Sequence, residues 1–316
     1  MRRLALPSTL LSKVQRLLPD GVGREYAIRF RLLRSSLSLQ SMRAERRADV
    51  LLVSYPKCGR TWLTMLLSRA LAAHAGVDDV DYLATDLLGG KTEGVPHIRI
   101  SHDGNPHWKT ARGLARSKRR YRGKQLILLV RDPRDIVVSM YFERSRRERA
   151  YSGTLHEFLH EPKGSLDTIL EYYNIWAQER TRPQAFCLVR YEDLKADTAA
   201  QVKRILRFVG LELADAHVEE AVRFASFENM RAMEAGDVLQ SGRLRARDPS
   251  DAESFKTRKA KVGGYVDYLS PEEIGWMEGK IRETLDPSYG YGEPALQRTE
   301  SRAVPSALSG PHGDAP

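Results

Sequence analysis

Residues 48–74 read ADVLLVSYPKCGRTWLTMLLSRALAAH and carry the clearest structural signal in the chain. The apolar run 50–54 is typical of a buried strand, and the longer apolar stretch 61–74 is typical of a helix. The turn between them, YPKCGR, would present unpaired backbone N–H groups at the positive end of the helix dipole. The segment therefore predicts a strand–turn–helix unit that holds an anion.

The residues of this turn suit a phosphate or sulfate group. Gly59 lets the backbone approach a bound anion closely, Lys57 adds a positive charge and Thr61 adds a hydroxyl donor. The pattern is not the Walker motif G-x-x-x-x-G-K-[ST], because its first glycine is missing and Lys57 precedes Gly59. An ordinary turn with a lysine in water is the alternative for this segment alone.

Short apolar runs alternate with helical stretches along the rest of the chain. We expect strands at 50–54, 97–101, 125–130 and 185–190, and helices at 61–74, 133–149, 165–179 and 199–209. Unbroken runs such as LILLV suit strands that are buried on both faces, and their alternation with helices favours a parallel sheet. The predicted fold class is therefore α/β, in which ligands bind beyond the carboxyl ends of the strands.

The composition is that of an ordinary globular protein with an excess of positive charge. The 316 residues include 51 Lys and Arg against 41 Asp and Glu, which gives a net charge of +10. No stretch approaches the roughly 20 apolar residues of a membrane span. Cys58 and Cys187 have no paired CxxC spacing, which argues against a disulfide framework and a thiolate zinc site. We therefore expect a cytoplasmic protein.

Three regions are predicted along the chain. Residues 1–48 form a basic amphipathic helical arm, 49–294 form the compact domain, and 295–316 form a disordered tail rich in Ser, Pro, Gly and Ala. The arm either packs on the domain with its basic face in water or makes a peripheral contact with an anionic membrane surface. The sequence leaves both alternatives and the oligomeric state open.

A second strand–helix junction lies in the sequence GKQLILLVRDPRDIVVSMYFERSRR. Asp132 is placed to cap the helix, Pro133 takes its first position and Asp135 lies in its first turn. Arg131 then stands at the carboxyl end of a buried strand, and Ser139 lies two turns into the helix. For this segment alone, a well-capped helix whose arginines face water is the simpler interpretation.

Both junctions resemble motifs of the sulfotransferase superfamily. YPKCGRTW is similar to the 5′-phosphosulfate loop YPKSGTTW, and RDPRDIVVS is similar to the 3′-phosphate motif. The resemblance implies a P-loop-NTPase-like three-layer fold, with a central parallel sheet flanked by helices. It also implies a sulfotransferase that uses 3′-phosphoadenosine 5′-phosphosulfate (PAPS) as the sulfuryl donor. The implied donor contacts are Lys57, Cys58, Gly59, Arg60, Thr61, Trp62, Arg131 and Ser139.

Two residues of the first motif depart from the family pattern. Cys58 replaces a serine, and Arg60 replaces a threonine and adds a charged donor for the sulfonate or a phosphate. A thiol at a helix N-terminus beside cations is expected to have a lowered pKa, with oxidation sensitivity as the consequence. A buried, inert thiol is the alternative interpretation of Cys58.

Three further segments follow in the family's order. KTRKAK resembles the Arg-Lys-Gly element that contacts the 3′-phosphate, whereas FCLVRYED and SFENMRAM resemble segments on the adenine side. The matching residues are Arg258, Lys259 and Ala260 in the first, and Tyr191, Ser226, Phe227 and Met230 in the other two. Aromatic and thioether side chains are reasonable walls for a purine, although they are equally ordinary core residues.

Transfer to an alcohol needs a base for the hydroxyl proton, and histidine suits this role because its unperturbed pKa is about 6.5. HIRISHDGNPHW resembles the family's KTHLP-type strand end, which implies His102 as the catalytic base. The family's lysine two residues earlier is absent here, so Arg99 or Arg60 would have to replace its charge. Asp103 either orients His102 or acts as the base itself.

The mechanism that the resemblance implies is an in-line displacement at sulfur. His102 deprotonates the acceptor hydroxyl, Lys57 neutralises charge on the bridging oxygen, and the loop N–H groups hold the sulfonyl oxygens. Arg131, Ser139 and Arg258 bind the 3′-phosphate. None of these steps requires a metal ion. The acceptor is a hydroxyl of a small molecule, a glycan or a lipid, and the sequence does not distinguish these classes.

Two other functions fit parts of the sequence. A nucleotide-dependent kinase or NTPase shares the strand–phosphate loop–helix architecture, with Asp132 as a carboxylate for magnesium. A non-catalytic basic adaptor would use the run KTARGLARSKRRYRGK, which contains eight Lys or Arg and no acid. We interpret that run as a solvated surface segment, with attraction of an anionic donor or acceptor as the alternative. It carries no nucleic-acid motif, so nucleic acid is not an expected partner.

Overall fold

The structure is a computed structural model, and it describes residues 43–90 and 92–292. The chain divides into two compact units, Met1–Ala48 and Asp49–Pro316. In the first unit the structure describes a short helix over residues 43–47. The rest of the predicted basic arm and the predicted tail at 295–316 lie outside the described residues.

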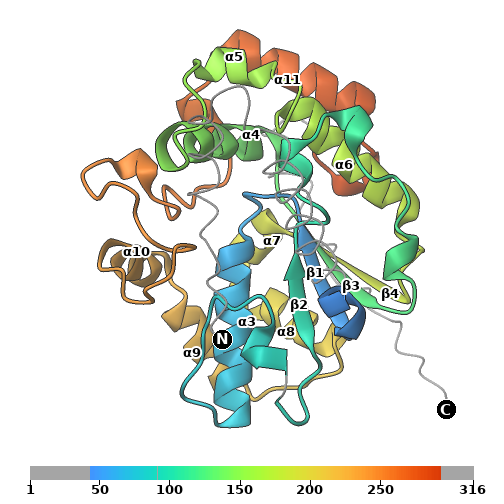
Figure 1. The fold of residues 1–316 in the computed structure, drawn as a ribbon, viewed down its shortest axis with the longest axis vertical. Coiled ribbons are helices and arrows are strands. Elements are labelled where there is room, and N and C mark those ends of the chain that lie inside the picture. Colours follow the sequence, from blue (N-terminus) through green and yellow to red (C-terminus); the bar gives the residue numbers. More distant parts are fainter. Residues whose placement is uncertain (1–42, 91, 293–316) are drawn as a thin grey trace, which may run out of the picture. The chain divides into compact units, whose positions relative to one another are not determined.

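The second unit is built on a four-stranded parallel sheet (Figure 1). The strands are β1 (Val50–Ser54), β2 (Ile98–Ser101), β3 (Gln125–Val130) and β4 (Ala185–Arg190). Their order in the sheet is β2-β1-β3-β4, so β1 and β3 are central. The predicted strands and their parallel arrangement are confirmed, with β2 beginning one residue later than expected.

Helices cover the sheet and connect its strands (Figure 1). Their bounds are α3 Arg60–Ala75, α4 Pro133–Phe142, α5 Leu155–Leu159, α6 Leu166–Glu179, α7 Tyr191–Ala196, α8 Thr198–Phe208, α9 Asp215–Phe224, α10 Phe227–Ala235 and α11 Pro271–Thr284. Every side chain of β1 is buried, as is every side chain of β3 after its first residue. This burial follows from the unbroken apolar runs, which leave neither face of a central strand suited to water.

The helix after β3 differs from the prediction of one helix over 133–149. It is α-helical only to Phe142 and continues as a π-helix, η5, over Glu143–Arg147. The N–H of Glu148 donates to the carbonyl of Glu143 at 2.8 Å, which is the wider spacing of a π-turn. Arg149 adopts a left-handed conformation, with φ of 51°, and ends the helical run. Short π segments occur often at functional sites.

The helix starts that follow β1 and β3 have different local causes. Asp132 caps α4 by accepting a hydrogen bond from the N–H of Arg134 at 3.0 Å, and Pro133 takes the first helical position. Gly59 precedes α3 in a left-handed conformation and provides no side-chain cap. The first backbone N–H groups of α3 therefore remain available to an anion.

Within residues 43–90 and 92–292, no helix is both long and apolar enough to cross a membrane.

Candidate active site

A cavity of about 510 Å³ lies at the carboxyl ends of the strands. Each strand is followed by a residue that lines it: Lys57 after β1, His102 after β2, Arg131 after β3 and Tyr191 after β4. Parallel strands bring their carboxyl ends to one edge of a sheet, so side chains far apart in sequence meet there. The cavity lies where the fold class predicts a ligand site.

The cavity contains nearly all the residues that the sequence motifs indicate. Those that line it are Lys57, Gly59, Arg60, Thr61, Trp62, His102, Arg131, Ser139, Tyr191, Ser226, Phe227, Met230, Arg258, Lys259 and Ala260. Cys58 is the exception among the implied site residues. The five motif regions and the histidine strand end thus converge on one space, although they span some 200 residues of sequence.

The turn after β1 depends on a glycine for two reasons. Gly59 has φ of 91°, which L-amino acids rarely adopt. A Cβ atom at this position would also lie 2.5 Å from Cδ2 of Tyr191. Because the ring of Tyr191 packs directly on the turn, the turn and the aromatic wall of the cavity have a fixed spacing. Lys57 shares the left-handed conformation, with φ of 73°.

The prediction of a lowered pKa for Cys58 is wrong. Its side chain is fully buried, its sulfur lies 3.5 Å from the hydroxyl of Tyr173, and burial raises the pKa of the thiol to about 12. The side chain turns toward the core and away from the cavity, so desolvation outweighs the nearby arginines. The structure favours the alternative interpretation of an inert, buried thiol.

His102 has a defined tautomer. Its Nδ1 lies 3.0 Å from the carbonyl oxygen of Ser54, and a carbonyl only accepts hydrogen bonds, so Nδ1 carries the proton. Burial lowers the pKa of His102 well below its usual value, and the positive charge of Arg60 lowers it further. The neutral ring therefore keeps an unprotonated Nε2, which is the form that a general base needs.

Asp103 does not assist His102, which corrects the two roles considered for it. Its buried carboxylate accepts hydrogen bonds from Lys118 at 2.5 Å and from the hydroxyl of Tyr121 at 2.6 Å, and it also pairs with Arg120. These partners occupy the carboxylate, whereas the ring of His102 binds Ser54. Asp103 is therefore a structural counter-ion.

The two candidates for the missing cation near His102 differ in position. Arg99 pairs with Asp86 at 2.5 Å and does not line the cavity, so it does not replace the missing charge. Arg60 lines the cavity and acts on the pKa of His102. Burial lowers the pKa of Arg60 itself to about 10, with a further contribution from Arg243.

The basic run at 109–124 is not simply a solvated segment. Lys118 is buried with the Asp103 carboxylate and lies 4.9 Å from the centre of the Trp176 ring. Arg116 matches the expectation, because two thirds of its side chain is exposed beside Glu171. Burial of Lys118 is a tertiary effect, since only the fold supplies its carboxylate and aromatic partners.

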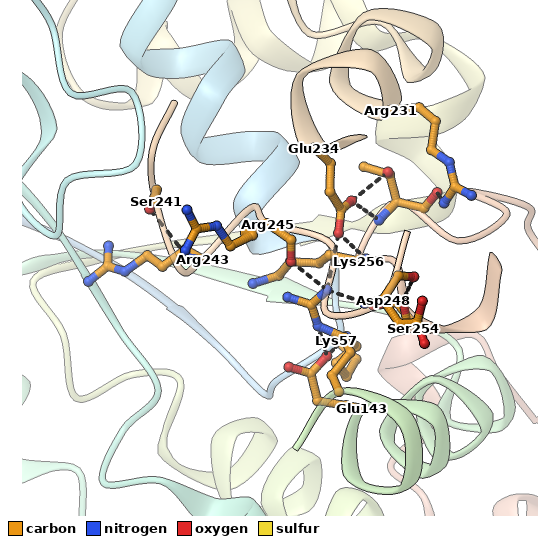
Figure 2. Close-up of polar contacts among 12 residues, drawn as sticks. Lys57, Glu143, Arg231, Glu234, Ser241, Arg243, Arg245, Asp248, Ser254 and Lys256 are labelled. Carbon is orange, nitrogen blue, oxygen red and sulfur yellow. Dashed lines mark hydrogen bonds and ion pairs between the residues drawn. The ribbon is translucent and has the colours of Figure 1, made fainter. Parts of the chain in front are cut away.

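Lys57 forms an ion pair that the sequence did not indicate. Its ammonium lies 2.6 Å from Oε2 of Glu143, and Figure 2 shows the two side chains joined by this contact. Burial alone raises the pKa of Glu143, but Lys57, Lys256 and Arg147 outweigh it and lower the pKa to about 2. Glu143 lies four residues after Ser139, so the shared helix face was the signal that could have identified it.

A second carboxylate, that of Glu234 in α10, holds the segment before Arg258. It is fully buried and accepts a hydrogen bond from the backbone N–H of Lys256 at 2.5 Å (Figure 2) and another from the backbone N–H of Thr257 at 2.8 Å. Arg147 of the π-helix donates to the same carboxylate at 3.1 Å. No local sequence pattern links these residues, which is why sequence reasoning missed Glu234 and Lys256.

Arg131 connects the turn after β1 to residues 256–261 (KTRKAK), which we call the C-terminal basic segment. Its guanidinium donates to the carbonyls of Lys57 at 3.4 Å and Lys261 at 3.1 Å, and it lies 4.5 Å from the ring centre of Tyr191. Asp135 forms an ion pair with it at 3.3 Å. The two phosphate-type motifs are therefore in direct contact through one arginine.

The C-terminal basic segment is held by its own partners. Arg258 donates to the hydroxyl of Tyr268 at 2.5 Å and to Glu253 at 3.0 Å, and Lys259 pairs with Asp267 at 3.0 Å. Ala260 has φ of 49°, a conformation that favours glycine. This explains physically why the related motif has glycine there, and it indicates strain at the alanine.

The side of the cavity that the resemblance assigns to adenine is aromatic. The ring centres of Trp62 and Tyr191 lie 5.7 Å apart in an edge-to-face arrangement, and Trp62 donates to the carbonyl of Ala225 at 2.9 Å. Ser226 caps α10 by accepting from the N–H of Asn229 at 3.3 Å, so its hydroxyl has a structural role.

In residues 43–90 and 92–292 no cluster of three His, Cys, Asp or Glu side chains is arranged to hold a metal.

Comparisons with known proteins agree with the motifs. Residues 47–288 match the profile of the sulfotransferase domain. The chain is 29% identical over 268 residues to cytosolic sulfotransferase 16 of Arabidopsis thaliana, covering 75% of this chain and 76% of that protein. It is 28% identical over 276 residues to flavonol 4′-sulfotransferase of Flaveria chlorifolia, covering 79% and 81%.

Two solved structures have a similar fold. A mouse sulfotransferase complexed with PAP has a TM-score of 0.55 at 19% identity, covering 82% of this chain and 90% of that one. A retinol dehydratase in complex with androsterone and the inactive cofactor PAP has a TM-score of 0.52 at 17% identity, covering 75% and 80%. These likenesses confirm the predicted P-loop-NTPase-like fold with a central parallel sheet between helices.

Proposed function

The chain belongs to the sulfotransferase domain family, and on that premise we propose that it transfers a sulfuryl group from PAPS to a hydroxyl acceptor by in-line displacement. The observation that carries the mechanism is the hydrogen bond from His102 Nδ1 to Ser54, which leaves Nε2 unprotonated in a cavity that Lys57 also lines. The solved relatives that contain PAP support the choice of donor.

The proposed donor site uses the two ends of the cavity. Lys57 and the free N–H groups at the start of α3 suit the phosphosulfate end, because a helix N-terminus and a lysine both favour an anion. Arg131, Ser139 and Arg258 would hold the 3′-phosphate. The contact of Arg131 with the Lys57 carbonyl fixes the distance between these two ends.

The proposed chemistry assigns one task to each side chain. His102 Nε2 takes the acceptor proton while the acceptor oxygen forms its bond to sulfur and the bond from sulfur to the bridging oxygen breaks. Lys57 stabilises the negative charge that develops on that bridging oxygen. The products are a sulfate ester and 3′-phosphoadenosine 5′-phosphate (PAP).

The displacement in this proposal does not call on a metal ion, since Lys57 and the loop N–H groups supply the positive charge. The kinase or NTPase alternative loses its main support, because the phosphate loop belongs to the sulfotransferase pattern and Asp132 has another task. Its carboxylate caps α4 and pairs with Arg134 at 2.7 Å.

The test is a labelled-sulfate transfer assay with purified protein and a panel of hydroxyl acceptors. His102→Gln is expected to lower turnover at least about 100-fold while PAP affinity changes less than about twofold. His97→Gln is the matched control, because His97 pairs with Asp86 at 2.7 Å outside the cavity. Turnover of His102→Gln at the wild-type rate would refute the histidine mechanism.

The donor site has its own measurement. Lys57→Ala is expected to abolish transfer, whereas Arg131→Ala is expected to weaken PAP binding by at least about tenfold in calorimetry, because it removes a charged bidentate donor. An unchanged dissociation constant of Arg131→Ala would rule out its role at the 3′-phosphate.

A further inference from the structure

The end of the cavity near His102 carries more positive charge than its own carboxylates balance. Lys57, Arg60 and Lys256 all line this space, and so do Glu143 and Glu148. Both carboxylates interact with Lys57, and Glu143 also interacts with Lys256. Within the described part of the chain, no ion pair or side-chain hydrogen bond is formed by the guanidinium of Arg60 or by the ammonium of Lys256.

Glu143 does not balance these two cations. Its carboxylate is in contact with Lys57 at 2.6 Å and with Arg147 at 3.3 Å. Glu234 does not balance them either, because it binds the backbone N–H of Lys256 (Figure 2), whereas its charge pairs with Arg147. Among the described residues, no carboxylate therefore contacts the guanidinium of Arg60 or the ammonium of Lys256.

Arg60 is close enough to Lys256 to lower its pKa, and burial disfavours the charged form of both side chains. Burial lowers the pKa of Lys256 to about 7; Glu143 opposes this effect, while Lys57, Arg147 and Arg60 add to it. Arg243, which donates to the hydroxyl of Thr85 at 2.7 Å, adds positive charge near Arg60. With a pKa of about 7, Lys256 is charged only part of the time in the free protein near neutral pH, and a bound anion would stabilise its charged form.

We propose that Arg60 and Lys256 form an anion-recognition subsite beside His102, so that the acceptor carries a carboxylate, sulfonate or phosphate group near the hydroxyl that is sulfated. This inference rests on the proposed function, because it assigns the adjoining part of the same cavity to the acceptor. The motif resemblance implies Arg60 as a donor contact. We assign it to the second substrate instead, because the donor's phosphates have other cationic partners in Lys57, Arg131 and Arg258.

The experiment is calorimetry on the full-length protein loaded with PAP. The probes are 4-hydroxybenzoate, 4-hydroxybenzenesulfonate, 4-hydroxyphenyl phosphate and the neutral methyl 4-hydroxybenzoate. We expect at least one anionic probe to bind about tenfold more tightly than the neutral ester, which corresponds to one charge-assisted contact. The three anionic arms identify which anion the subsite prefers. Equal affinity for the neutral ester and every anion would overturn the inference.

Variants test which residues cause the preference. Arg60→Met and Lys256→Met are each expected to reduce it to less than about threefold, whereas Arg60→Lys retains it because the charge is kept. Arg207→Met is the control, since it removes one positive charge from an exposed position outside the cavity. A weaker PAP affinity in Arg60→Met with an unchanged anion preference would assign Arg60 to the donor and contradict the subsite.

The proposed function and the subsite fail in different ways. PAP affinity of the unmodified protein is measured first, and an absence of PAP binding would contradict the donor site on which both proposals depend. Normal PAP binding and sulfate transfer without any preference for the anionic probes would contradict the subsite alone.

Discussion

At the scale of single residues, Gly59 sets how closely the anion-binding turn approaches the aromatic wall of the cavity. Both its φ of 91° and the distance of 2.5 Å from a Cβ atom to the Tyr191 ring exclude a side chain there. Tyr191 cannot retreat easily, because it is buried and its ring also contacts Arg131 and Trp62. The glycine is therefore required by packing as well as by backbone conformation.

We expect Gly59→Ala to be more damaging than a glycine substitution that strains the backbone only. Gly76 provides the comparison, because it has φ of 64° at the end of α3 and open space where a Cβ atom would lie. Gly76→Ala should cost about 1–2 kcal/mol in urea unfolding. Gly59→Ala should cost more than this and lower PAP affinity by at least about tenfold. Equal losses of stability in the two variants, with unchanged PAP binding, would contradict the packing argument.

The dependence of kcat/KM on pH below neutrality is a second test at the scale of single residues. Burial, followed by the charge of Arg60, lowers the pKa of His102, so the neutral form persists below the usual titration range of histidine. Because the base acts in its deprotonated form, kcat/KM should show no inflection at about pH 6.5 and should fall only at lower pH. Arg60→Met should move this inflection toward higher pH. A wild-type profile that halves near pH 6.5 would contradict the effect of burial.

At the scale of elements, one carboxylate connects three segments around the cavity. Glu234 belongs to α10, Arg147 belongs to the π-helix η5, and Thr257 belongs to the segment that leads to Arg258. The hydroxyl of Thr257 also donates to Glu234 at 2.7 Å. The position of the basic C-terminal segment thus depends on a buried ion pair rather than on its own secondary structure.

Glu234→Gln is expected to loosen this connection while keeping the size of the side chain. Removal of one partner of a buried ion pair leaves Arg147 with Glu143 as its remaining counter-charge, so unfolding free energy should fall by about 3 kcal/mol. PAP affinity should fall as well, because Arg258 loses its fixed position. Glu219→Gln, in the exposed part of α9, is the control for chemical denaturation and calorimetry. Wild-type stability of Glu234→Gln would show that the ion pair is not a structural connection.

At the scale of the whole molecule, the parallel sheet is what brings the site together. Lys57, His102, Arg131 and Tyr191 are spread over more than 130 residues, yet each follows a strand whose carboxyl end lies at the same edge. The same core encloses both cysteines, which are free and buried. Access to either thiol therefore requires the packing around the sheet to open.

We expect both thiols to be unreactive in the native protein. Burial raises the pKa of Cys58 to about 12, and burial also raises the pKa of Cys187. A thiol reagent such as 5,5′-dithiobis(2-nitrobenzoic acid) should therefore label neither cysteine within minutes at neutral pH and both after unfolding in guanidinium chloride. The sequence contains two cysteines, so the titration has no other contributor. Rapid labelling of Cys58 in the native protein would restore the prediction of a reactive thiol.

Local patterns were sufficient for the strands, for the parallel sheet and for the edge at which the site lies. A run such as Gln125–Val130 leaves no face for water, and its alternation with helices admits few arrangements. The family resemblance then identified the residues that line the cavity. These features depend on neighbours in sequence or on motifs with a fixed spacing, so they are visible before folding.

The partners of the charged side chains could not be predicted from local patterns or motifs. Lys57 meets Glu143 from 86 residues away, and Arg147 meets Glu234 from 87 residues away. The inward direction of the Cys58 thiol, the enclosure of Asp103 by Lys118 and the proximity of Arg60 and Lys256 likewise depend on segments that only packing brings together. The strength of an ion pair depends on the distance between the two charges and on their desolvation, and neither quantity can be predicted from the separation of the residues in sequence.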